Sequence, residues 1–172
     1  MSPELITRAV DRDHCLGTWD RVLLQIWRWE VHPASVAELD RIARAFMADR
    51  SRRISSLAVI EATATPPSPA ARQALSKFYR ELASAMTLAV VVPEGSGFRA
   101  AFVRGVGLTL STLSPHMLPF KFVGSVDQAA LLLAPHLSPA AGGAEALVER
   151  IEELRLALTN HAPHPPVFSV NR

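Results

Sequence analysis

The stretch ISSLAVIEATATPPSPAARQALSKFYRELASAMTLAVVV, residues 54–92, decides the fold. It consists of an apolar run (Ile54–Ile60), a proline turn (Ala64–Pro69), a helical pattern (Ala70–Met86) and a second apolar run (Leu88–Val92). Two short, continuous apolar runs that flank a helix of this length are typical of a strand–helix–strand crossover in a parallel sheet. The sequence therefore predicts an α/β fold.

Further predicted elements lie on both sides of this crossover. Upstream, a run rich in β-formers and apolar on both faces predicts a strand covered on two sides over Val22–Val31, and a one-sided apolar stripe predicts a helix over Val36–Asp49. Downstream, we expect a helix near Phe98–Leu113, a strand over Phe120–Val126 and a short helix that ends at about Leu133. Polar and apolar residues alternate along this last strand, which suits the edge of a sheet.

Two tryptophans lie on the first of these strands and allow two interpretations. Trp27 and Trp29 share a face with Leu23 and Val31, so the first interpretation places both in the core. The alternative is an exposed recognition patch, because aromatic side chains dominate binding hot spots. Trp29 is the stronger candidate for such a patch because it is nearer the end of the strand.

The two ends of the chain lie outside the central domain, which we place at residues 18–137. Residues 1–17 are mixed and polar, and the sequence leaves open whether Ile6–Val10 adds an edge strand. Residues 138–160 are expected to form a linker and a C-terminal helix, and residues 161–172 a disordered, proline-rich tail. The helix carries an apolar stripe that either docks onto the domain or forms a homodimer seam. The stripe consists of Leu147, Ile151, Leu154 and Leu158.

Composition is that of a globular domain, and it narrows the classes of partner. The 172 residues are enough for one buried core, and the net charge is only +2. The densest basic cluster, Arg50–Arg53, is too short to be the basic stripe of a nucleic-acid binder, so we expect no nucleic-acid partner. The chain shows neither a signal-peptide pattern nor a long apolar span. We therefore expect a cytoplasmic protein with no membrane partner.

The residue types that usually bind metals are sparse. Cys15 is the single cysteine, which excludes an intrachain disulfide and argues against a thiolate-rich zinc site. It follows His14, but no further ligand stands at a suitable spacing. We expect no metal and no cofactor, and the sequence shows no catalytic residue set.

The order of the predicted elements, strand and helix alternating four times, and the ending FKFVGSVDQAALLL (Phe120–Leu133) resemble the STAS family. This is the domain shared by sulphate transporters and anti-sigma-factor antagonists. The resemblance covers roughly Arg21 to Leu137 and is one of pattern. It implies a mixed sheet of four to five strands with helices packed on it. It also implies a bacterial regulatory or adaptor domain that binds another protein and does not catalyse a reaction.

The STAS family carries a phosphorylation switch, an Asp-Ser-Ser/Thr-Gly turn between a strand and the next helix. The corresponding turn here is ATATPPSP (Ala62–Pro69), which contains Thr63, Thr65 and Ser68 but neither aspartate nor glycine. Ser68 is the best positional match and is the phosphorylation candidate, and the resemblance implies a kinase or another regulator as partner. N-capping of the following helix, with Pro69 as its first residue, explains the same serine without a switch.

We expect binding residues where the parallel strands end, because α/β folds place their sites at that edge. The turns that follow the two apolar runs of the crossover meet there, and the adjoining helix extends the surface. An alternative is a small-ligand binder or enzyme at the same edge, with Glu61 and Glu94 as paired carboxylates and Arg99 and Arg104 as further polar groups. The predicted protein-binding surface consists of Thr63, Thr65, Ser68, Glu94, Gly95, Ser96 and Arg99.

Overall fold

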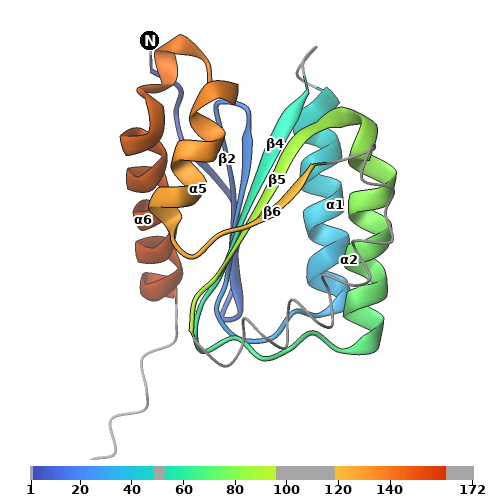
Figure 1. Ribbon diagram of the computed structural model, residues 1–172. Coiled ribbons are helices and arrows are strands. Elements are labelled where there is room, and N and C mark those ends of the chain that lie inside the picture. Colours follow the sequence, from blue (N-terminus) through green and yellow to red (C-terminus); the bar gives the residue numbers. More distant parts are fainter. Residues whose placement is uncertain (1, 49–52, 96–118, 162–172) are drawn as a thin grey trace, which may run out of the picture.

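The computed structural model describes residues 2–48, 53–95 and 119–161. One sheet forms the middle of three layers, with helices on both of its faces (Figure 1). The strands are β1 (Ile6–Val10), β2 (His14–Trp19), β3 (Val22–Trp27), β4 (Ile54–Ile60), β5 (Met86–Pro93) and β6 (Phe120–Phe122). The described helices are α1 (Pro33–Ala48), α2 (Pro69–Leu82), α5 (Val126–Leu133) and α6 (Gly143–His161), with short 3-10 turns at Ala83–Ala85, Ala134–His136 and Pro139–Ala141.

The six strands lie across the sheet in chain order, and the sheet is mixed. β1, β2 and β3 form an antiparallel meander, whereas β3, β4, β5 and β6 pair in parallel. α1 and α2 each connect two neighbouring parallel strands and cover the same face of the sheet (Figure 1). The predicted α/β fold is therefore confirmed, and the predicted crossover is β4–α2–β5.

β2 is a strand that the sequence analysis did not predict, so the sheet has six strands in place of the expected four to five. Its sequence, HCLGTW, mixes polar and apolar residues with a glycine and shows no strand periodicity. All six residues are nevertheless buried, because β2 lies between β1 and β3 and α6 packs across it. The segment Ile6–Val10, which the sequence left open as a possible strand, forms the edge strand β1.

One predicted strand is shorter than expected, and one predicted helix cap is confirmed. The strand expected over Val22–Val31 ends at Trp27, because the N–H groups of Arg28 and Trp29 donate to the carbonyl of Asp13 and turn the chain out of the ladder. Ser68 is the N-cap of α2, as predicted, and its Oγ accepts from the N–H of Ala71. The helix expected near residues 98–113 lies outside the described residues, and so does the tail from residue 162.

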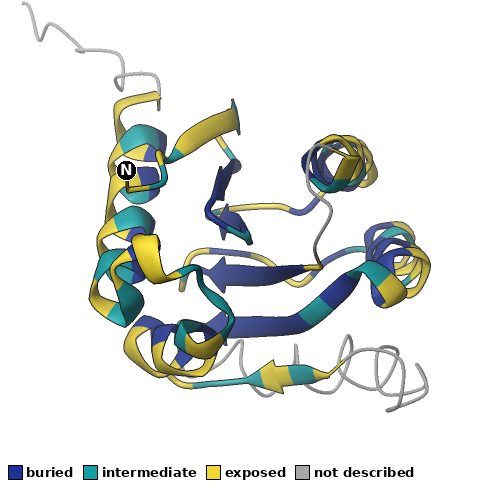
Figure 2. Ribbon diagram, turned by 90° about the horizontal axis from the view of Figure 1, so that it is seen from above, coloured by how far each residue is buried: buried dark blue, intermediate teal, exposed yellow. Residues whose placement is uncertain are grey.

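The core is divided by the sheet into two clusters. Val22, Leu24 and Ile26 of β3 pack with α5 and α6, whereas Leu23 and Trp27 pack with α1 and α2. This is the two-faced burial predicted for β3, and Figure 2 shows the buried strands between helices that are buried on their inner sides and exposed on their outer sides. Because both faces of the sheet are buried, polar side chains that could contact a ligand or partner are expected mainly at the ends of the strands.

The apolar stripe of α6 packs inside the chain. Leu147, Ile151, Leu154 and Leu158 are all fully buried. Gly17 of β2 lets α6 approach closely, since a Cβ at this position would lie 3.0 Å from Cδ2 of Leu154. This is intrachain docking, one of the two alternatives left by the sequence. A homodimer seam through the same side chains would require α6 to leave the sheet.

The docking of α6 can be tested with two leucines of the same helix. Leu154→Ala should lower the free energy of unfolding by about 2–5 kcal/mol, because it leaves a cavity against β2. Leu156→Ala should change it by less than about 0.5 kcal/mol, since Leu156 is 61% exposed. Urea denaturation followed by circular dichroism measures both values. Equal, small effects would contradict the docked position of α6.

Candidate functional site

Three turns meet at the carboxyl ends of β3, β4 and β5, and we call this surface the carboxyl edge (residues 28–32, 61–68 and 94–95). Backbone hydrogen bonds join the turns. The N–H of Glu61 donates to the carbonyl of Trp27 (2.8 Å), and that of Glu94 donates to the carbonyl of Ile60 (2.7 Å). The N–H of Thr65 donates to the carbonyl of Trp29 (2.8 Å). The turns therefore form one connected surface, as the sequence analysis expected.

Exposed threonines and a tryptophan lie side by side on this surface. Thr63 and Thr65 are both exposed, and Oγ1 of Thr63 donates to the carbonyl of Arg28 (2.6 Å). Trp29 is 40% exposed, whereas Trp27 is buried in the core at 2%. The two interpretations of the tryptophans thus divide between them: Trp27 is a core residue, and Trp29 is the exposed aromatic.

The two carboxylates proposed as a pair, Glu61 and Glu94, share one guanidinium. Arg155 of α6 donates from Nη1 and Nη2 to Glu94, at 3.1 and 2.5 Å, and its Nη1 lies 3.6 Å from Oε1 of Glu61. Arg28 donates to Glu61 from Nε (2.6 Å) and Nη2 (3.2 Å). These side chains are 13–31% exposed, so much of the network is shielded from water.

This network limits the chemistry available to the two carboxylates. The hydrogen bond to Glu94 raises the pKa of Arg155, and it outweighs burial, which lowers it. Glu61 and Glu94 therefore face a guanidinium that stays charged. Each carboxylate oxygen that accepts from an arginine has less hydrogen-bonding capacity left for a substrate. The sequence analysis missed Arg28 and Arg155, and the only signal was their position, one after a strand and the other on the charged side of the final helix.

Ser68 and Gly95 have local structural roles. The Oγ of Ser68 accepts from the N–H of Ala71 at 3.2 Å, and the residue is half-buried. Arg72 lies against the same turn, with Nη1 donating to the carbonyl of Pro67 (3.3 Å). Gly95 has a φ of +96°, and a Cβ there would lie 3.1 Å from that of Ala62. The turn after β5 needs a glycine both for this backbone angle and for its approach to the turn after β4.

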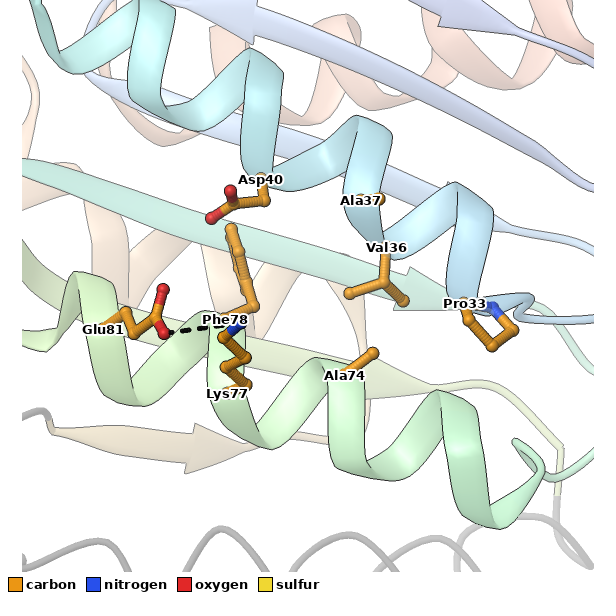
Figure 3. A pocket seen from close by; sticks show the side chains of 8 residues that line it. All are labelled: Pro33, Val36, Ala37, Asp40, Ala74, Lys77, Phe78 and Glu81. Atoms are coloured by element: carbon orange, nitrogen blue, oxygen red, sulfur yellow. Dashed lines mark ion pairs between the residues drawn. The ribbon is translucent and has the colours of Figure 1, made fainter.

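An open groove of about 210 Å³ separates α1 from α2 on the outer surface (Figure 3). The side chains of Val36 and Phe78 point into it. Arg44 bridges the two helices at one end, since it is 2.8 Å from both Asp40 and Glu81. The other end begins at Pro33, directly after residue 32 of the carboxyl edge. The lining residues are Pro33, Val36, Ala37, Asp40, Ala74, Lys77, Phe78 and Glu81.

Of the remaining residues singled out in the sequence, three lie outside the described residues and one lies in β2. Ser96, Arg99 and Arg104 lie outside the described residues. Cys15 is buried in β2, and burial raises the pKa of its thiol to about 11. In the described parts of the chain, no three side chains of the types that bind metals lie close enough together to hold an ion.

Comparison with known proteins identified no relative of this chain. No protein-family model, curated protein or solved structure matches the chain. Among the described helices, none is both long enough and apolar enough to cross a membrane.

The Arg155 network can be tested against a second arginine of α6. Arg155→Gln should lower the free energy of unfolding by about 1–3 kcal/mol, because Glu61 and Glu94 are shielded and lose their shared donor. Arg150→Gln should cost less than about 1 kcal/mol, since its ion pairs among the described residues are with the exposed Glu149 and Glu153 of its own helix. Urea denaturation at neutral pH measures both. The network would be wrong if the two variants lost the same stability.

Proposed function

We propose that this chain is a cytoplasmic bacterial regulatory or adaptor domain, without catalytic activity, that binds a protein partner through its carboxyl edge. The observation that carries the proposal is the exposed indole of Trp29, presented beside Thr63 and Thr65. Tryptophan is among the residues most enriched in binding hot spots, and the exposed threonines of the neighbouring turn add groups that can form hydrogen bonds.

The carboxyl edge is held in place before any partner arrives. The backbone of Trp29 is held on both sides of its Cα, because its N–H donates to the carbonyl of Asp13 and its carbonyl accepts from the N–H of Thr65. Thr63 is tied to the same loop through Arg28. A preorganised surface loses little conformational entropy on association, so more of the contact energy appears as affinity. The groove between α1 and α2 adjoins this edge and adds apolar area.

A phosphorylation switch at Ser68 belongs to the same proposal and rests on the STAS-like pattern. A phosphate at the N-terminus of α2 would be stabilised by the helix dipole and by the N–H of Ala71, which already faces Oγ of Ser68. Arg72 lies at the neighbouring Pro67 and offers a cation within the same turn. The proposed partner is then a kinase or another regulator that responds to the phosphorylated edge.

A small-ligand site at the same edge is the second candidate. It is favoured by the convergence of Glu61 and Glu94 on one guanidinium at the ends of two neighbouring strands. The variant Glu94→Gln distinguishes the two candidates. If a small ligand binds at this edge, native mass spectrometry should show it on the wild type and not on the variant. A protein partner bound at Trp29 should stay bound to both.

The binding proposal predicts the effect of removing the exposed indole. From lysate of its own organism, the tagged protein should retain a stoichiometric protein partner, and Trp29→Ala should lose it by quantitative mass spectrometry, because the variant lacks its aromatic anchor. Leu156→Ala is the matched control, since it removes an exposed apolar side chain from α6 and should retain the partner. A partner that both variants retain would overturn the assignment of this edge.

Two substitutions separate capping from switching at Ser68. Ser68→Ala should lower the free energy of unfolding by about 0.5–2 kcal/mol because α2 loses its N-cap, whereas Ser68→Asp should preserve the cap. Denaturation and partner capture are measured on both. If Ser68→Asp leaves partner binding equal to that of the wild type, Ser68 is a cap and the switch is rejected.

A further inference from the structure

Trp29 lies beside a turn that carries acidic side chains. The turn between β1 and β2 reaches Trp29 through the carbonyl of Asp13, which accepts from the N–H groups of Arg28 (2.8 Å) and Trp29 (3.3 Å). His32 joins this turn to the Trp29 loop, since its two ring nitrogens lie 3.8 Å from Asp13 and 3.6 Å from Glu30. Two acidic residues from different segments are therefore close neighbours of Trp29: Glu30 follows it in the chain, and the carbonyl of Asp13 accepts from its N–H.

A second pair of carboxylates lies on either side of a buried histidine below this loop. His14 is only 1% exposed, and its ring packs on Trp27 with the centroids 5.1 Å apart. Its Nδ1 lies 3.0 Å from Asp11 and its Nε2 lies 3.6 Å from Glu38, yet neither nitrogen has a well-formed hydrogen bond among the described residues. The buried imidazole therefore lies between two carboxylates that come from different elements, the turn after β1 and helix α1.

The four carboxylates form what we call the acidic collar: Asp11, Asp13, Glu30 and Glu38. Their side chains are 25–53% exposed. The nearby arginines are Arg12, in the same turn, and Arg41, which is 3.8 Å from Glu38. With His14 and His32 counted as neutral, and Arg28 balanced by its partner Glu61, the four carboxylates and two arginines leave a formal charge of −2 on this face, although the whole chain carries +2 on the same count. A face with a negative formal charge favours cations over anions.

We propose that the partner presents a basic segment to this face, with an arginine or lysine stacked on Trp29 and its charge within the acidic collar. The inference rests on the proposed function and specifies the chemistry of its partner. The face of an indole attracts a cation through its quadrupole, and tryptophan is the best aromatic partner for this contact. The collar carboxylates add charge-assisted hydrogen bonds, for which the planar guanidinium of arginine is best suited. An acidic segment or an anionic surface is repelled by the same charges.

The experiment uses the full chain and two defined peptides, acetyl-tetra-arginine amide and acetyl-tetra-glutamate amide. The chain has three tryptophans, so its indole N–H signals can be followed by NMR, with that of Trp29 identified by its loss in Trp29→Phe. The arginine peptide should shift the Trp29 signal to saturation and leave those of the buried Trp19 and Trp27 nearly unchanged. The glutamate peptide should shift none, and added salt should weaken the arginine complex.

A charge reversal supplies the matched comparison. Glu30→Lys should lower the affinity for the arginine peptide about tenfold. Glu149→Lys, which reverses an exposed charge on α6, should lower this affinity less than about twofold. The inference is overturned if the arginine peptide leaves the Trp29 signal unmoved, if the glutamate peptide moves it equally, or if the two variants bind alike. If a captured partner depends on Trp29 while the peptide fails, only the basic chemistry is wrong. If the peptide binds at Trp29 but no partner is captured, the site stands and the adaptor function fails.

Discussion

The structure depends on the burial of the central strands on both faces. Every residue of β3 and β4 is buried, so helices must cover each side of the sheet, and each helix must be amphipathic. The same constraint removes polar chemistry from the faces. The one polar cluster of the described core that links these strands, Gln25 with Ser56 and Tyr79, is internally hydrogen-bonded. Groups that can meet a partner are therefore concentrated where the strands end.

The carboxyl edge is stabilised by a second set of interactions that joins distant parts of the chain. Arg155 connects α6, the last described helix, to the turns after β4 and β5, and Arg28 connects β3 to Glu61. Shielded charges of this kind are costly to leave unpaired, so the network holds the turns in one arrangement. As a result α6, which docks through its apolar stripe, also holds the carboxyl edge in place through Arg155 on its polar side.

Residues with strong local signals were predicted well, and residues whose environment comes from distant segments were not. Ser68 was predicted as an N-cap because its neighbour Pro69 marks the first turn of a helix. β2 was missed because its burial comes from β1, β3 and α6 and leaves no periodicity in HCLGTW. At the edge, the turns and their threonines were expected, whereas the pairing of Glu94 with a residue 61 positions away had no local signature.

The sequence by itself determined the α/β class, the β4–α2–β5 crossover and the edge at which its turns meet, because apolar periodicity and turn residues act over a few positions. Only the tertiary structure decided that Trp27 is buried and Trp29 exposed, and that the turn of Asp13 lies against the Trp29 loop. The pattern places both tryptophans on one strand face and favours exposure of Trp29 only through its position nearer the end of the strand. The two residues differ because the chain leaves the sheet after Trp27, where the carbonyl of Asp13 accepts hydrogen bonds from the N–H groups of Arg28 and Trp29.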